Sequence, residues 1–258
     1  MAKAMVLDTS KCIACRACQV ACKQWNKLDA VSTTFDGTYD NPPTFRGAYC
    51  RVTFHETEAQ GKHTWLFTKR QCMHCHDAAC RTVCPTGAIY RTDFDATHID
   101  PRRCIGCNYC AANCPFDIIW YDHKTNTARK CTFCVDRVTS GQQPACVKTC
   151  PAGAIAFGER EDMVSQAKQR VNILARSGYP KAQVYGLREL GGTSALYVLI
   201  DEPEAFGLLT EPSLPLTAQV WGTIFKPLRV LAVAALALGL LGNYRHTRDL
   251  QPGRPGSE

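Results

Sequence analysis

The placement of the cysteines constrains the fold of this chain more than any other feature of its sequence. All but one of its 17 cysteines fall into four short groups of four. The groups are Cys12, Cys15, Cys18 and Cys22; Cys72, Cys75, Cys80 and Cys84; Cys104, Cys107, Cys110 and Cys114; and Cys131, Cys134, Cys146 and Cys150. Thiols this dense are either oxidised to one another or bound to metal, and the two possibilities imply different folds.

A disulfide framework fits the sequence poorly. The first cysteine group begins at residue 12, which leaves no room before it for the charged and apolar segments of a signal peptide. The cysteine count of 17 is odd, so the cysteines cannot all pair within the chain. Closely spaced cysteines without a secretory signal favour metal binding. Cys50, the cysteine outside the groups, is predicted to be a small buried apolar side chain.

The spacing within the groups is typical of iron–sulfur clusters. The first and third groups read C-x2-C-x2-C-x3-C, the second widens one gap to four residues and the fourth inserts eleven. In the last three groups a proline and a β-prone run follow, in "CPTGAIY", "CPFDIIW" and "CPAGAIAF". Three close cysteines can wrap one cluster, while the fourth, turned away at the proline, ligates a neighbouring cluster. The sequence therefore predicts four 4Fe-4S clusters in two pairs.

Zinc is the competing metal. All-cysteine zinc sites usually combine two separated C-x2–4-C pairs, and only the fourth group resembles that arrangement. His74 and His76 lie among the cysteines of the second group, but a Rieske centre needs histidines in place of cysteines, and none is missing here. Hydrogen bonding near a cluster, or simple exposure, is predicted for these two histidines.

The basic charge does not indicate a nucleic-acid partner. The formal net charge is +7, and four clusters with thiolate ligands, at about −2 each, would bring the total close to neutral. Much of the basic excess lies beside the cysteines, where cations would stabilise thiolates and tune cluster potentials, although each one alone could equally be an ordinary surface charge. These residues are Lys11, Arg16, Lys23, Arg70, Arg81, Arg102, Arg103, Arg129, Lys130 and Lys148.

Several segments resemble the four-cluster ferredoxin-type subunits of molybdopterin oxidoreductases, most closely the beta subunits of respiratory formate dehydrogenases. They include "CIACRACQVACKQWN", "CMHCHDAACRTVCPTGAI", "RCIGCNYCAANCPF", "KCTFCVDRV", "PACVKTCPAGAI", "GYPKAQVYG", "GGTSALYVL" and "WGTIFKPLRVLAVAALALGLL". The resemblance covers nearly the whole chain. Some relatives replace a cysteine of the third group with tryptophan and hold a three-iron cluster, whereas this group is intact.

The resemblance implies a specific set of ligands for each cluster. The last cysteine of the first group ligates the cluster of the fourth group, and the last cysteine of the fourth group ligates that of the first. The second and third groups exchange their last cysteines in the same way. The implied sets are Cys12, Cys15, Cys18 and Cys150; Cys72, Cys75, Cys80 and Cys114; Cys104, Cys107, Cys110 and Cys84; and Cys131, Cys134, Cys146 and Cys22. The first group departs mildly from its neighbours, because Lys23 replaces the proline and the turn there must be made otherwise.

We therefore expect an α+β fold of two interleaved ferredoxin-like units, each with two clusters, followed by an extension and a single C-terminal helix. The expected divisions are a four-cluster domain at 1–160 with the second unit inserted at about 69–123, a helix and strand extension at 161–212, a C-terminal helix at 213–245 and a flexible tail at 246–258. Strands are predicted at "YCRVTF", "HTWLFT", "AQVYG" and "SALYVLI", and a turn-rich connection at "FDGTYDNPPTFRG". "EREDMVSQAKQRVNILARSG" predicts a helix that packs through Val164, Ala167, Val171, Leu174 and Ala175 and stops at Gly178.

The C-terminal helix is predicted to be a membrane anchor, and a helix docked on a partner subunit is the alternative. The uninterrupted apolar run is Val230 to Gly242, which is short of the ~20 residues that span a bilayer. It reaches that length from Phe225 to Tyr244 only if Lys226 and Arg229 extend to the interface. Trp221 and Tyr244 lie at suitable interfacial positions.

No catalytic or phosphate-binding signature stands out, so one-electron transfer is the predicted chemistry and no catalytic residue is predicted. The resemblance implies a molybdenum- or tungsten-pterin catalytic subunit that oxidises formate, and a membrane cytochrome b-type subunit or another acceptor. It does not fix the direction of electron flow. The same subunit of a hydrogenase or another molybdopterin reductase, a free-standing polyferredoxin and a zinc scaffold are the alternatives. Membrane association is expected, with the periplasmic side favoured over the cytoplasmic side. On the periplasmic side, the chain would have to cross the membrane folded, together with a catalytic partner that carries a twin-arginine signal.

Overall fold

The computed structural model describes residues 1–32, 37, 44–59 and 62–249. The chain divides into two compact units, Met1–Pro215 and Leu216–Glu258. The first unit is built on a four-stranded sheet in the order β8-β1-β10-β9, formed by β1 (Lys3–Asp8), β8 (Ile155–Glu159), β9 (Gln183–Tyr185) and β10 (Ala195–Leu199). Strand β1 precedes the first cysteine group and pairs antiparallel with β8, which follows the fourth group. This pairing brings the two ends of the cysteine-rich region together.

The two faces of the sheet bury different partners. Because successive side chains of a strand point to opposite faces, Val6 packs against Ala167 and Leu174 of α6 (Arg160–Arg176). Its neighbour Met5 faces the other way, into a cluster of buried side chains that includes Tyr197 of β10 and several of the cysteines. One face of the sheet is therefore covered by a helix, and the other supports the cysteine-rich region.

Helix α6 confirms the predicted packing helix. It begins with acidic residues in its first turn and ends at Arg176, shortly before Gly178 at φ +96°. The predicted packing face was wrong for Ala175, which is exposed, whereas Leu174 is buried. One residue along a helix turns the side chain by about 100°, which carries Ala175 off the buried face. Met163 packs on this face in addition to the predicted residues.

The repeat around each Cys-Pro pair is a single helical turn before the pair and a short strand after it. Helices α2 (Ala79–Thr82), α3 (Tyr109–Ala112) and α5 (Ala145–Lys148) end before the last cysteine of their groups, and β4 (Ile89–Arg91), β6 (Trp120–Asp122) and β8 follow. Strand β4 pairs with β5 (Thr97–Ile99), and β6 pairs with β7 (Thr127–Arg129). A further helix, α4 (Val135–Thr139), lies inside the fourth group, and short 3-10 turns occur at Glu189–Gly191 and Pro203–Phe206.

The first cysteine group differs from the others in its helix. Helix α1 (Ala17–Trp25) runs through Cys22 and Lys23, because lysine keeps the backbone N–H that proline lacks. The Lys23 Nζ donates hydrogen bonds to the carbonyls of Asp29 and Gly47, the latter at 3.0 Å. A longer helix thus replaces the turn that proline makes in the other groups.

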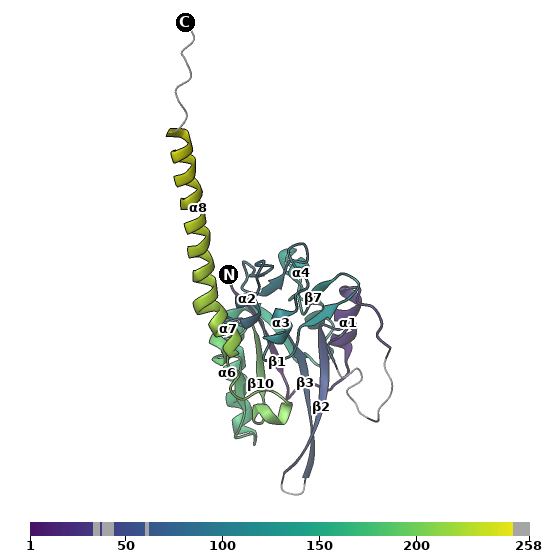
Figure 1. Cartoon of the computed structure of the whole chain (residues 1–258). Coiled ribbons are helices and arrows are strands. Elements are labelled where there is room, and N and C mark those ends of the chain that lie inside the picture. The colour runs from purple at the N-terminus through teal and green to yellow at the C-terminus, as the bar shows by residue number, and fades with distance from the viewer. Residues whose placement is uncertain (33–36, 38–43, 60–61, 250–258) are drawn as a thin grey trace. The chain divides into compact units, whose positions relative to one another are not determined.

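Strands β2 (Cys50–Ala59) and β3 (Lys62–Gln71) form a long antiparallel hairpin that extends away from the rest of the unit (Figure 1). It confirms the two strands predicted between the first and second groups. At its base, Cys50 pairs with Gln71 and both are buried. Of the predicted turn-rich connection at 35–47, residues 35, 36 and 38–43 lie outside the described part of the chain.

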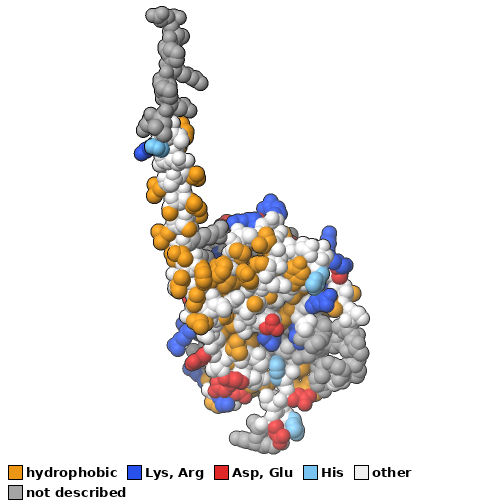
Figure 2. Space-filling model, viewed as in Figure 1, with side chains coloured by type: hydrophobic (Ala, Val, Ile, Leu, Met, Phe, Trp, Pro, Cys, Tyr) orange, Lys and Arg blue, Asp and Glu red, His pale blue; other side chains and the backbone are white. Residues whose placement is uncertain are grey.

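The second unit is a continuous helical segment made of α7 (Leu216–Val220), a π-helical turn (Trp221–Phe225) and α8 (Lys226–Asp249). Within the described residues, Leu216–Thr247 is the one helix long and apolar enough to cross a membrane. It has 32 residues, and none of its apolar stretch is buried. Figure 2 shows apolar side chains along this helix, and its exposed residues include Leu231, Leu236 and Leu240. Residues 250–258 of the predicted tail lie outside the described residues.

Candidate iron–sulfur centres

All four cysteine groups share one backbone feature. The residue just before the second cysteine has a positive φ in each group: Ala14 (54°), His74 (52°), Gly106 (69°) and Phe133 (58°). This left-handed conformation curls the chain, so that a backbone N–H points back at the first cysteine. His74 N donates to Cys72 Sγ at 3.4 Å, and Phe133 N donates to Cys131 Sγ at 3.4 Å. Such donors favour the thiolate form that metal binding requires.

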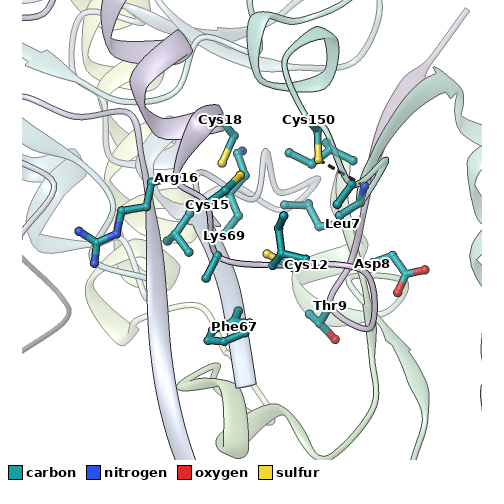
Figure 3. Close-up of a pocket in the computed structure, with 16 residues that line it drawn as sticks. Leu7, Asp8, Thr9, Cys12, Cys15, Arg16, Cys18, Phe67, Lys69 and Cys150 are labelled. Carbon is teal, nitrogen blue, oxygen red and sulfur yellow. Dashed lines mark hydrogen bonds between the residues drawn. The ribbon is translucent and has the colours of Figure 1, made fainter. Parts of the chain in front are cut away.

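Three cysteines of the first group share a cavity with the last cysteine of the fourth group. Cys12, Cys15, Cys18 and Cys150 line it together with Lys69 (Figure 3). The Cys150 sulfur also accepts a hydrogen bond from Ala154 N at 3.3 Å. The pairing of β1 with β8 explains why residues so distant in sequence meet here. Burial raises the pKa of the Cys12 thiol, and the nearby charges of the other three cysteines raise it further.

The second group is combined with the last cysteine of the third group. Cys72, Cys75, Cys80 and Cys114 line a second cavity with mostly apolar walls. Burial raises the pKa of Cys75 above its usual range, and the charges of its three partners add to this.

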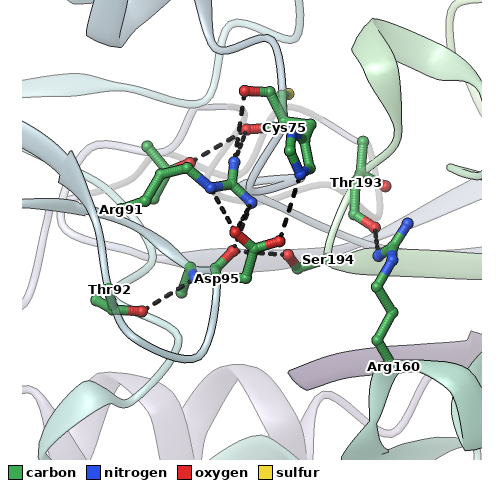
Figure 4. A network of polar contacts seen from close by, with 10 residues as sticks. Cys75, Arg91, Thr92, Asp95, Arg160, Thr193 and Ser194 are labelled. Carbon is green, nitrogen blue, oxygen red and sulfur yellow. Dashed lines mark hydrogen bonds and ion pairs between the residues drawn. The ribbon is translucent and has the colours of Figure 1, made fainter. Parts of the chain in front are cut away.

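A polar network fixes the loop of the second group (Figure 4). Arg91 donates to the Cys75 carbonyl at 2.7 Å and to Asp95 Oδ1 at 2.6 Å. Ser194, next to β10, donates to the Asp95 carbonyl at 2.9 Å. The central sheet and the β4–β5 hairpin therefore hold this loop in place.

The remaining cysteines also lie near one another, in part across groups. Burial raises the pKa of Cys110 to about 12, and the charges of Cys104, Cys107 and Cys84 contribute. Cys22 and Cys131 belong to one buried cluster of side chains, which also includes Cys50. Burial raises the pKa of Cys134 to about 11, and the charge of Cys146 contributes.

Cys84 is the exception among these thiols. Burial acts to raise its pKa, but hydrogen bonds from the Ile89 and Ala88 backbone and from Thr86 outweigh it, so the pKa is lowered.

The cysteine sulfurs are spread too widely for mononuclear zinc. Within the described residues, which include every cysteine, no three His, Cys, Asp or Glu side chains are close enough to hold a single metal ion. Zinc draws its sulfur ligands to ~2.3 Å from one centre, whereas a 4Fe-4S cluster takes each thiolate on a different iron and keeps the sulfurs farther apart. Four thiols around a largely apolar cavity fit an iron–sulfur cluster. Asp8 also lines the first of these cavities, but its carboxylate accepts hydrogen bonds from Arg170 and Ser10.

The structure also identifies one buried residue that the sequence did not single out, and it settles the exposure of two histidines that the sequence did. Lys69 lies on β3 and is 4% exposed, although no cysteine lies beside it in the sequence. His74 is fully buried, not exposed, and among the described residues neither ring nitrogen makes a hydrogen bond of normal geometry. Burial lowers the pKa of His74, although the Thr97 backbone acts to raise it. Its ring packs on that of Phe133 with centroids 4.5 Å apart. His76 is largely exposed and lies 3.7 Å from Asp95.

Cys50 has the predicted buried, apolar setting. It is 2% exposed, and its Sγ lies 3.7 Å from the carbonyl oxygen of Cys18.

Comparison with known proteins agrees with this geometry. Two family models, each described as a 4Fe-4S dicluster domain, match residues 11–88 and 63–160. The nitrate-inducible formate dehydrogenase iron–sulfur subunit of Escherichia coli is 43% identical over 246 residues, which cover 93% of this chain and 84% of that protein. The chain belongs to the family of formate dehydrogenase iron–sulfur subunits.

Another member of this family, and a relative outside it that covers less of the chain, also match. The formate dehydrogenase iron–sulfur subunit of Haemophilus influenzae is 41% identical over 93% of this chain and 79% of its own length. A thiosulfate reductase electron transfer subunit of Salmonella typhi is 38% identical over 61% of this chain and 76% of its own length. The recognition of the family from the cysteine motifs is therefore confirmed, and so is the 4Fe-4S cofactor.

Proposed function

We propose that this chain is the electron-transfer subunit of a formate dehydrogenase and carries four 4Fe-4S clusters between a catalytic subunit and an electron acceptor. The observation that carries the proposal is the presence of four cysteine groups of iron–sulfur geometry in a chain of this family. A bound 4Fe-4S cluster exchanges one electron at a time. The chain's own residues hold the clusters in a rigid, largely dry fold and supply the charges and hydrogen bonds that surround them.

We further propose that the ligand sets exchange one cysteine between groups. Cys150 completes the set of Cys12, Cys15 and Cys18, while Cys22 completes that of Cys131, Cys134 and Cys146. Cys114 completes the set of Cys72, Cys75 and Cys80, while Cys84 completes that of Cys104, Cys107 and Cys110. The shared cavities and mutual charges described above support these sets. The ferredoxin-like units are accordingly interleaved, with the second inserted at about 69–123 within the domain at 1–160.

The partners of this subunit are a molybdenum- or tungsten-pterin catalytic subunit and a membrane cytochrome b-type subunit. The names of the relatives support the first, since they are subunits of formate dehydrogenases. One related beta subunit from Nitratidesulfovibrio vulgaris carries the label cytochrome c-553, which supports a cytochrome as acceptor. The unburied apolar helix of the second unit supports a membrane anchor within the segment 213–245. We propose the periplasmic side of the membrane for the cluster-bearing unit.

The cofactor is tested on protein purified without oxygen. We expect about sixteen iron and sixteen sulfide per chain and a brown colour, together with paramagnetic signals on reduction and co-purification of a pterin subunit. Colourless protein with zinc would overturn the proposal. Co-purification of a hydrogenase or another reductase subunit would reassign the substrate, and recovery of the chain alone with all its iron would indicate a free-standing polyferredoxin.

The ligand sets are tested with pairs of substitutions. Cys12→Ser and Cys150→Ser together should remove no more iron than either alone, because both belong to one cluster. Cys150→Ser with Cys131→Ser should remove about twice as much, because they belong to two clusters. If the first pair removed about twice as much iron as either substitution alone, and the second pair removed no more than either alone, Cys150 would belong to a cluster held by its own group.

A further inference from the structure

Two lysines are buried in the cysteine-rich region, which is an unusual setting for this residue type. Lys69 is 4% exposed and Lys130 is 3% exposed. A buried ammonium is costly unless it is paired with a negative charge. We therefore looked for the charge that balances each one.

In the described part of the chain, neither ammonium has a carboxylate partner. Lys69 Nζ donates to the side-chain oxygen of Gln71, a neutral group. Lys130 Nζ donates to the carbonyls of Thr97, at 2.5 Å, and Cys131, at 3.1 Å. These hydrogen bonds solvate the ammonium groups but do not balance their charge. Asp8 lines the same cavity as Lys69 but pairs with Arg170 at 2.9 Å, so the cysteines are the negative groups left to balance the two lysines.

Each lysine lies between two of the proposed ligand sets. Lys69 lines the cavity of Cys12, Cys15, Cys18 and Cys150 (Figure 3). Burial works to lower its pKa, but the charges of Cys146, Cys50, Cys18 and Cys131 raise it well above its usual value. Apart from Cys50, the cysteines that Lys69 faces thus come from the first and fourth groups.

Lys130 occupies the equivalent place between the second and fourth groups, because its Nζ bonds both to Thr97, which lines the cavity of the second group, and to Cys131 of the fourth group. Burial works to lower its pKa, while the charges of Cys72, Cys80 and Cys131 raise it. The two lysines reach these positions through different parts of the chain. Lys130 directly precedes a cysteine, whereas Lys69 is brought in by the β2–β3 hairpin.

We propose that Lys69 and Lys130 are the internal counter-charges of the iron–sulfur clusters, and that each raises the reduction potential of the clusters between which it lies. The proposal rests on the proposed function, because it requires bound clusters. Lys69 acts on the clusters held by the first and fourth groups, and Lys130 on those held by the second and fourth. Reduction adds one negative charge to a cluster, and a fixed ammonium in a dry interior favours that added charge. The cluster of Cys131, Cys134, Cys146 and Cys22 lies near both lysines and receives both effects.

The test is a redox titration, followed by electron paramagnetic resonance, of the complex carrying Lys69→Met or Lys130→Met. Methionine removes the charge and retains most of the side-chain length. We expect at least a tenfold loss in the equilibrium constant for reduction of the adjacent clusters, which is a potential lowered by about 59 mV for one electron. Lys69→Met should leave the cluster of the second group unchanged, and Lys130→Met should leave that of the first group unchanged.

Lys148→Met is the matched control, because Lys148 lies between two ligands in sequence but is exposed. Water and salt screen its charge, so we expect a much smaller shift. Loaded variants with unshifted potentials, or with shifts no larger than that of Lys148→Met, would overturn the proposal.

Further outcomes distinguish a failure of this inference from a failure of the proposed function. If Lys69→Met fails to retain iron, Lys69→Arg decides, because it keeps the charge. Retention of all clusters at unchanged potentials in Lys69→Arg would support the proposal, and loss of iron there would overturn it. Wild-type protein without iron would overturn the proposed function itself, before any variant is compared.

Discussion

At the residue scale, the residue before the second cysteine has two different roles in the four groups. Ala14 and Gly106 are small, whereas His74 and Phe133 carry rings that pack on each other at 4.5 Å. His74 comes from the second group and Phe133 from the fourth, so this ring pair joins two cysteine loops that are distant in sequence. Both rings are buried, and Phe133 also packs against Phe157 of β8.

We expect His74→Ala to destabilise the loaded protein by about 3 kcal/mol, because it removes a buried ring and leaves a cavity. His74→Phe should cost about 1 kcal/mol or less, since it keeps the ring packing and, among the described residues, the imidazole nitrogens make no hydrogen bond of normal geometry that could be lost. Chemical denaturation of oxygen-free samples measures both. Equal losses for the two variants would show that the imidazole, not the ring contact, is needed.

At the scale of the elements, the cysteine loops depend on the hairpins beside them. The third group turns at Gly106, where φ is +69° and an added Cβ would lie 2.5 Å from the Asn126 carbonyl, at the turn between β6 and β7. A glycine at this position therefore allows the loop and the hairpin to approach closely.

Gly106→Ala should consequently displace the loop and reduce the iron bound by the third group, lowering total iron by up to a quarter of the roughly sixteen atoms expected for four clusters. Gly141→Ala is the matched control. It has a similar φ of +72° but nothing within 4 Å of the added Cβ, so it should cost ~1 kcal/mol of stability and no iron. Iron analysis and denaturation separate the two effects, and full iron in Gly106→Ala would contradict the close approach.

The helices and strands also show how much of the fold and of the candidate site could be predicted from the sequence. The cysteine spacing, the strands after each Cys-Pro pair and helix α6 were all readable, because each depends on local sequence. The continuation of α1 through Lys23 was not, since the missing proline showed that the turn must differ but not what replaces it. Lys69 was missed for a different reason: a lysine in a strand normally faces water, and only the packing of the hairpin base buries it. The exposure of Ala175 could not be predicted either, because it depends on how much of the helix surface the sheet covers.

At the scale of the whole molecule, the division at Pro215 separates two kinds of surface. The first unit contains every cysteine, and the second exposes a helix of apolar side chains. Because no cysteine lies beyond residue 150, cluster binding and membrane attachment should be separable.

A chain ending at Pro215 should therefore retain about sixteen iron atoms and be recovered in the soluble fraction, while the full chain sediments with membranes. Leu236→Arg in the full chain should weaken membrane attachment by placing a charge in the apolar helix, at a cost of about 3 kcal/mol. Fractionation and iron analysis measure both. A truncated chain that still sediments with membranes would assign attachment to a partner subunit and not to this helix.

The strand order of the central sheet bears on how the protein is made. Strand β1 lies at the start of the chain, yet its sheet neighbours β8 and β10 begin at residues 155 and 195. During synthesis the first strand cannot pair with these neighbours until most of the polypeptide has emerged from the ribosome. Cysteines near the start stay unshielded throughout that interval, so the insertion of iron at this end belongs to the last stage of biogenesis.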